Sequence, residues 1–177
     1  WTDFGTAGVS QTALARLVAE HMAGLRRTDA AILTGPQSNI ALATRASTFQ
    51  SVLRERGLRH DSILLVESEN LRDAAEAGVL GLAQQRRMPG LLLAATDTLA
   101  IGALRALREL GVAVPVEVAV SGVDDAPMAR DVFPSLTTVA APFERIGQEL
   151  VALALSDSAS RQVVLDAELV PRDSTRV

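Results

Sequence analysis

The sequence contains no cysteine, so disulfide bonds and thiolate metal sites are excluded. It has only two histidines, His21 and His60, and they lie far apart in the chain. A zinc site would need more ligands than these two side chains supply. We therefore expect both histidines to face solvent, and we predict neither a metal nor a cofactor.

An excess of positive charge is also lacking. The formal net charge is −4 and the isoelectric point is near 5.2, which argues against a nucleic-acid-binding surface on this segment. No apolar run approaches the roughly 20 residues of a membrane span, and no basic-then-apolar secretory signal opens the chain. The first residue is Trp1 and not Met, so we expect a processed chain or a fragment of a longer one.

Apolar residues make up 48% of the 177 residues, enough for one domain or two small lobes with a buried core. Four short runs are rich in valine, isoleucine and leucine, and none alternates polar with apolar positions. Such runs are typical of parallel strands that are buried on both faces. They are "AAILTGP" from Ala30, "SILLVES" from Ser62, "GLLLAATD" from Gly90 and "VAVSGVDD" from Val118.

Helix-period segments separate these runs, with Asn39 as a plausible cap and Gly57 and Gly111 as stops. Strand followed by helix, repeated, predicts an α/β fold with a doubly wound parallel sheet. The expected helices cover residues 11–25, 41–56, 71–85, 98–110 and 142–155.

Polar residues follow each predicted strand, in "GPQSN", "ESEN", "TDT" and "VDD". In doubly wound sheets the ligand crevice lies at the carboxyl ends of the strands. We therefore expect these residues to converge on one edge, with Asp124 where a polar ligand would enter.

Several longer stretches resemble the LacI/GalR family of bacterial transcription regulators. The motifs are "AATDTLAIGAL", "ELGVAVPVEVAVSGVDD", "PSLTTV" and "PFERIG". Earlier, "TGP" followed by Arg45 and Phe49 fits the same pattern, and "LVPRDST" near the end resembles the closing motif of the family. The resemblance extends over almost the whole chain.

The resemblance implies a periplasmic-binding-protein-like core of two lobes that binds a small effector, usually a sugar or a nucleobase, in the cleft between them. It also implies a homodimer in the cytoplasm that contacts operator DNA only through an N-terminal helix-turn-helix domain absent from this chain. The protein would then be an effector-sensing repressor core and not an enzyme.

The resemblance also suggests the site residues. Asp124 matches the acid that hydrogen-bonds the effector, and Arg45 matches an arginine that reaches the effector. Thr96 and Asp97 align with an Asn-Asp pair, and Thr96 lacks the amide that can both donate and accept. Within "ESENLRDAAEAG" there is no aromatic residue to stack on a ligand. The remaining expected ligand-binding residues are Ser38 and Asn70.

Plainer interpretations compete with these roles. Asp124 fits a strand-end turn, and Asp97 fits an N-cap or first-turn acid of the helix that follows better than a ligand contact. Asp125 fits local capping or a supporting position. Arg45 is a natural partner for Asp124 when the site is empty. The "LTTV" segment fits a crossover between lobes.

The motif positions predict residues 1–139 as the second lobe, 140–160 as a helix of the first lobe and 161–177 as a return to the second lobe. That helix has an apolar stripe at helical spacing, which we expect to have lost the sheet that covers it. The stripe consists of Phe143, Ile146, Gly147, Leu150, Val151 and Ala154.

Two other functions are compatible with the predicted fold. A periplasmic sugar-binding protein of a transporter would share it, although the "LTTV" and "PFERIG" motifs favour a regulator. An α/β enzyme is the second alternative, but the sequence has no GxSxG motif, no phosphate loop and few nucleophile–base pairs.

Overall fold

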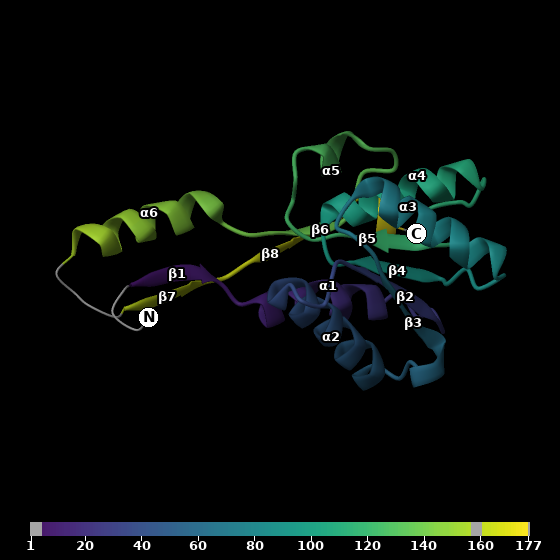
Figure 1. Cartoon of the computed structure of the whole chain (residues 1–177), viewed down its shortest axis with the longest axis horizontal. Helices are drawn as coiled ribbons and strands as arrows, with labels where there is room; N and C mark the ends of the chain where they lie inside the picture. Colours follow the sequence, from purple (N-terminus) through teal and green to yellow (C-terminus); the bar gives the residue numbers. More distant parts are fainter. Residues whose placement is uncertain (1–4, 157–160, 177) are drawn as a thin grey trace.

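The computed structural model describes residues 5–156 and 161–176, and most of them form a larger unit around a parallel sheet (Figure 1). The strand order is β3-β2-β4-β5. The strands are β2 (Ala30–Thr34), β3 (Ile63–Glu67), β4 (Leu91–Ala94) and β5 (Ala119–Ser121). Ala30 lies beside both Ile63 and Leu91, so the amino ends of the strands are level. The four expected parallel strands are confirmed, and β2, β4 and β5 are buried on both faces. The edge strand β3 differs, because Leu65 is 45% exposed.

Helices cover both faces of this sheet, as the doubly wound prediction requires (Figure 1). One face packs on α1 (Gln11–Ala23) and α2 (Ile40–Glu55), where Ile32 and Leu93 meet Phe49. The other face packs on α3 (Arg72–Gln84) and α4 (Asp97–Glu109), where Leu33 and Leu92 meet Leu99. Alternate residues of each strand therefore supply two separate apolar cores.

Local capping explains where the helices begin and end. The Asn39 side chain accepts hydrogen bonds from the first backbone N–H groups of α2, as expected. Gly57 and Gly111 have φ values of 100° and 70°, a left-handed conformation that glycine adopts without strain. Both predicted stops are confirmed.

A second, two-stranded sheet lies next to β5. It pairs β6 (Thr138–Ala140) with β8 (Glu168–Val170) in antiparallel register, and a bridge from Ser121 to Thr137 joins it to the larger sheet. Short helical turns complete the larger unit. These are η1 (His60–Ser62), α5 (Met128–Asp131) and η2 (Asp173–Thr175).

A smaller unit extends from the larger one and contains β1 (Thr6–Val9), β7 (Gln162–Leu165) and α6 (Phe143–Leu155) (Figure 1). β1 and β7 pair in parallel. This differs from the sequence-based division, which assigned residues 6–9 and 162–165 to the second lobe. β1 is short and contains Gly8, so only its distant partner reveals it as a strand. Residues 1–4, 157–160 and 177 of the expected ranges lie outside the described residues.

The helix α6 rests on β1 but leaves most of its apolar stripe in solvent. Leu153 approaches Gly5, whereas Phe143 and Val151 of the stripe are 64% and 60% exposed. The expected helix is present, and a two-stranded sheet covers part of it. Across the described residues, no helix combines the length and apolarity that a membrane crossing requires.

The chain passes between the two units three times (Figure 1). We call these passages the first crossover (residues 9–11), the second crossover (β6 and the residues after it) and the third crossover (residues 166–172, which contain β8). All three enter the larger unit near the carboxyl ends of β4 and β5.

Candidate functional site

Arg45 and Asp124 form an ion pair at the carboxyl edge of the larger sheet. The Arg45 Nη1 atom lies 3.0 Å from Asp124 Oδ1 and also donates to the Ala95 carbonyl oxygen at 2.7 Å. Its Nε atom donates to Gln11 Oε1 at 2.7 Å. Arg45 is therefore held on three sides, and the pairing expected for the empty site is present.

The second carboxylate oxygen of Asp124 remains available to a ligand. Among the described residues it accepts no hydrogen bond, and 35% of the side chain is exposed. Burial raises the pKa of Asp124 above its ordinary value, while the neighbouring Arg45 guanidinium opposes that rise. A half-buried carboxyl group with a free oxygen can accept hydrogen bonds from ligand hydroxyl groups.

Thr96 and Asn70 also meet at this edge. The Thr96 hydroxyl donates to Asn70 Oδ1 at 2.7 Å and caps α4 by accepting from the Leu99 N–H. Thr96 is thus the N-cap, and Asp97 has the second of its two expected roles, that of a first-turn acid of α4. Ser38 lies in an exposed turn after β2, and none of its side-chain contacts within the described residues joins it to the other predicted site residues.

Asp97 lies behind the site and not in it. Asp97 is 1% exposed. Its carboxylate accepts hydrogen bonds from the Thr138 hydroxyl at 2.6 Å and from the Ala126 N–H at 2.7 Å. Burial is the main cause that raises the pKa of Asp97 to about 6. A carboxylate held in this way supports the loop that carries Asp124, and it does not face a ligand.

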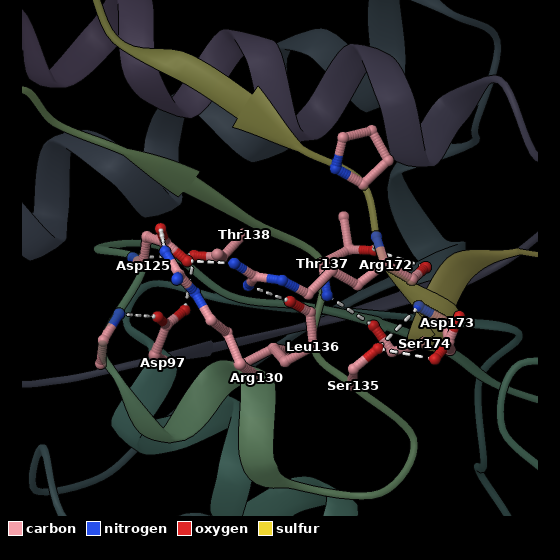
Figure 2. Close-up of polar contacts among 12 residues, drawn as sticks. Asp97, Asp125, Arg130, Ser135, Leu136, Thr137, Thr138, Arg172, Asp173 and Ser174 are labelled. Atoms are coloured by element: carbon pink, nitrogen blue, oxygen red, sulfur yellow. Dashed lines mark hydrogen bonds and ion pairs between the residues drawn. The ribbon is translucent and has the colours of Figure 1, made fainter.

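Asp125 fits the second of its two expected roles, a supporting position, better than local capping. Its carboxylate pairs with Arg172, near the end of the chain, and with Arg130 of α5 (Figure 2). The sequence contained one relevant signal, because Arg172 belongs to the "LVPRDST" motif. Thr138 likewise belongs to the "PSLTTV" motif, whereas nothing in the sequence indicated Gln11, whose partner Arg45 lies far away in the chain.

The histidines differ from one another. His60 is exposed as expected, but His21 is half-buried and its Nε2 atom lies 2.8 Å from the Thr175 hydroxyl. Burial lowers the pKa of His21. Within residues 5–156 and 161–176, no three acidic or histidine side chains gather as metal ligands would.

A family model described as a periplasmic binding protein-like domain matches residues 19–175. The chain belongs to this family. Among regulators, the HTH-type transcriptional regulator CelR of Thermobifida fusca is 29% identical over 98% of this chain. The regulator DegA of Bacillus subtilis is 31% identical over 89% of this chain.

The fold comparison gives the same result. The chain superposes on a solved complex of the transcriptional regulator CelR with cellobiose at a TM-score of 0.87 and 25% identity, over 98% of this chain and 54% of that one. The resemblance to the effector-binding core of LacI/GalR regulators is thus confirmed. The chain spans about half the length of the curated relatives it matches, 51% of CelR and 48% of DegA.

Proposed function

We propose that this periplasmic-binding-protein-like domain is the effector-sensing core of a LacI-type transcription repressor and that it binds a small sugar-like molecule. One observation carries the proposal. Asp124 presents an unengaged carboxylate oxygen at the carboxyl edge of a parallel sheet, next to the three crossovers. A ligand bound there contacts the segments that join the two units, so its binding is linked to their relative orientation.

Hydroxyl groups suit this edge better than phosphate does. Arg45 is already paired with Asp124 and Ala95, while Glu67 and Glu69 lie exposed at the end of β3. An anionic ligand would meet net negative charge there, whereas a neutral polyol donates to carboxylates. The cellobiose bound in the CelR complex supports a sugar as the first class to test.

Ligand-induced stabilisation tests this proposal. The chain is heated with cellobiose, ribose, other sugars, sugar phosphates and nucleosides, and the melting temperature is followed by fluorescence. A ligand at 100 times its dissociation constant adds about 2.7 kcal/mol to the free energy of unfolding. The variant Asp124→Ala should lose that stabilisation. If no sugar or nucleoside stabilises the wild-type chain, sugar sensing is refuted.

We further propose that the protein acts in the cytoplasm, catalyses no reaction, and reaches operator DNA only through residues outside these 177. The relatives named above are regulators of transcription, which favours this role over that of a transport-binding protein. With a net charge of −4, this chain alone should not retard operator DNA in a gel. Sequence-specific retardation by the isolated chain would contradict the proposal.

A homodimer is the assembly we propose, formed through the surface around α4 and α5. A groove of about 390 Å³ runs there, and Phe133 is 86% exposed at its edge. Ile101 and Val132 also line it, flanked by Arg105 and Arg108. An apolar centre with an arginine rim is a usual composition for an interface. We call this the α4–α5 surface.

A further inference from the structure

The two adjacent acids, Asp124 and Asp125, both adopt left-handed backbone conformations. Their φ values are 115° and 48°, and neither residue is glycine. Such conformations are costly for residues that carry a Cβ atom, and they persist only where the surroundings hold them. The loop that presents Asp124 to a ligand therefore depends on contacts from outside itself.

The second crossover holds the backbone of this loop. The Asp124 N–H donates to the Val139 carbonyl oxygen at 3.0 Å, and the Asp125 N–H donates to Thr138 Oγ1 at 3.2 Å. Thr138 in turn donates to Asp97, which also accepts from the Ala126 N–H (Figure 2). The backbone from residue 124 to 126 is thus tied to β6 and to the start of α4.

The end of the third crossover holds the Asp125 side chain. Arg172 Nη2 donates to Asp125 Oδ1 at 2.5 Å, while its Nη1 donates to the Leu136 carbonyl oxygen at 2.8 Å (Figure 2). Only 12% of the Arg172 side chain and 14% of the Asp125 side chain are exposed. Since the pair is largely withdrawn from water, removing one partner leaves the other charge uncompensated.

Two further contacts complete the arrangement. Arg130 of α5 approaches the other oxygen of Asp125 at 3.3 Å, but 69% of its side chain is exposed, so this second pair contributes little. On the opposite side, Arg45 connects Asp124 to Gln11 in the first crossover. Asp124 is therefore linked through its side chain to the first crossover, and Asp125 to the third.

We propose that Asp125 is the positioning residue of the effector site. Its ion pair with Arg172 fixes the left-handed loop, so that Asp124 faces Arg45 and keeps one oxygen free for a ligand. The same pair attaches the loop to the third crossover. A change in the position of the third crossover therefore moves Asp124. In return, a ligand bound to Asp124 favours one position of the third crossover over another. This inference rests on the proposed function.

A purely structural role for the pair would have a different consequence. If Asp125 and Arg172 simply stabilised the whole fold, their loss would speed opening everywhere, including the centre of the sheet. If they position the loop, their loss opens the loop locally while the sheet stays closed. Amide hydrogen exchange resolves the two cases residue by residue.

The test measures amide exchange by NMR in the ligand-free chain, for the wild type and for Asp125→Asn, Arg172→Met and Arg172→Lys. The N–H groups of residues 124 and 125 should exchange on the order of ten- to a hundredfold faster in the first two variants. Amides of β4 should keep their wild-type rates. Arg172→Lys retains the charge and should recover part of the protection. Arg176→Met is the matched control, because that arginine is 68% exposed, and it should change nothing.

Two results would overturn the inference. In one, residues 124 and 125 exchange at wild-type rates in Arg172→Met and Asp125→Asn. In the other, the amides of β4 accelerate as much as those of the loop, which assigns the pair to general stability. Because no ligand is present, these results are independent of the sugar screen. A negative screen therefore refutes the proposed function without changing the outcome for the loop.

Discussion

Arg45 and Asp124 share an ion pair in which the arginine is the better buried partner. The side chain of Arg45 is 10% exposed and that of Asp124 is 35% exposed, with 3.0 Å between Nη1 and Oδ1. The arginine is also fixed by Gln11 and Ala95, so it acts as a rigid support. We propose that the acid is the member that meets a ligand.

Replacing either member should weaken ligand binding. In Asp124→Ala and in Arg45→Ala we expect a loss of roughly 2–5 kcal/mol of affinity for a sugar found in the thermal screen, because one partner of a desolvated charge pair is removed. Titration calorimetry measures this. Arg16→Ala serves as the control, since that arginine pairs with Glu55 at an exposed place. Unchanged affinity in both test variants would exclude the pair from the site.

The free energy of unfolding should depend on pH through Asp97. Burial raises the pKa of this group from its ordinary value of 3.8 to about 6, so the folded state holds the proton more tightly than the unfolded state. Its stabilising contribution is greatest at low pH and is lost as pH rises through about 6. Relative to Asp97→Asn, we expect wild-type stability to fall by roughly 2 kcal/mol between about pH 4 and about pH 7. Urea denaturation measures both proteins, and parallel pH profiles would contradict the prediction.

Two glycines on facing helices should respond oppositely to alanine. A Cβ atom on Gly102 of α4 would lie 2.2 Å from the Arg72 carbonyl oxygen, so Gly102→Ala forces α3 and α4 apart. We expect a loss of about 1–3 kcal/mol. Gly81 of α3 has open space at the same position, and Gly81→Ala should stabilise the chain by roughly 0.5–1 kcal/mol. Thermal or urea unfolding measures both, and equal effects would show that the helices are not in close contact.

The α4–α5 surface and the apolar stripe of α6 should contribute differently to association between chains. We expect Phe133→Glu to convert a homodimer to a monomer, because it replaces an exposed apolar side chain of the α4–α5 surface with a charge. Leu150→Glu on α6 should instead reduce non-specific self-association, since that stripe lacks a complete covering layer. Sedimentation and light scattering distinguish the two effects. A Phe133→Glu variant that remains a dimer would place the interface elsewhere.

Sequence patterns predicted the larger unit well for a physical reason. Continuous apolar runs and capped helices such as α2 and α4 depend on local spacing, so each is readable within its own residues. The strands β1 and β7 could not be predicted from local sequence patterns. They have four residues each and are stabilised by pairing with one another across most of the chain.

The same distinction applies to the site. Asp124 and Arg45 were predicted from motif positions and from the carboxyl edge of the sheet. Gln11 and Arg172 were missed because their partners are fixed only once the three crossovers lie side by side. Asp97 illustrates a second limit. Both Thr96 and Asp97 are residue types that cap helices. Thr96 is the cap because Thr138 of β6 binds the Asp97 carboxylate, which leaves the Leu99 N–H to the Thr96 hydroxyl.

The position of Arg172 also sets the order in which the protein becomes functional during synthesis. The four strands of the larger sheet and their helices are contiguous from residue 11 to residue 121, so they can fold as they leave the ribosome. The arginine that fixes the Asp124 loop is made some fifty residues later. A nascent chain therefore holds a finished sheet before it holds a finished binding loop. A chain truncated before Arg172 would lack the partner of Asp125, and with it Ser174 and Thr175, which are buried against the larger unit.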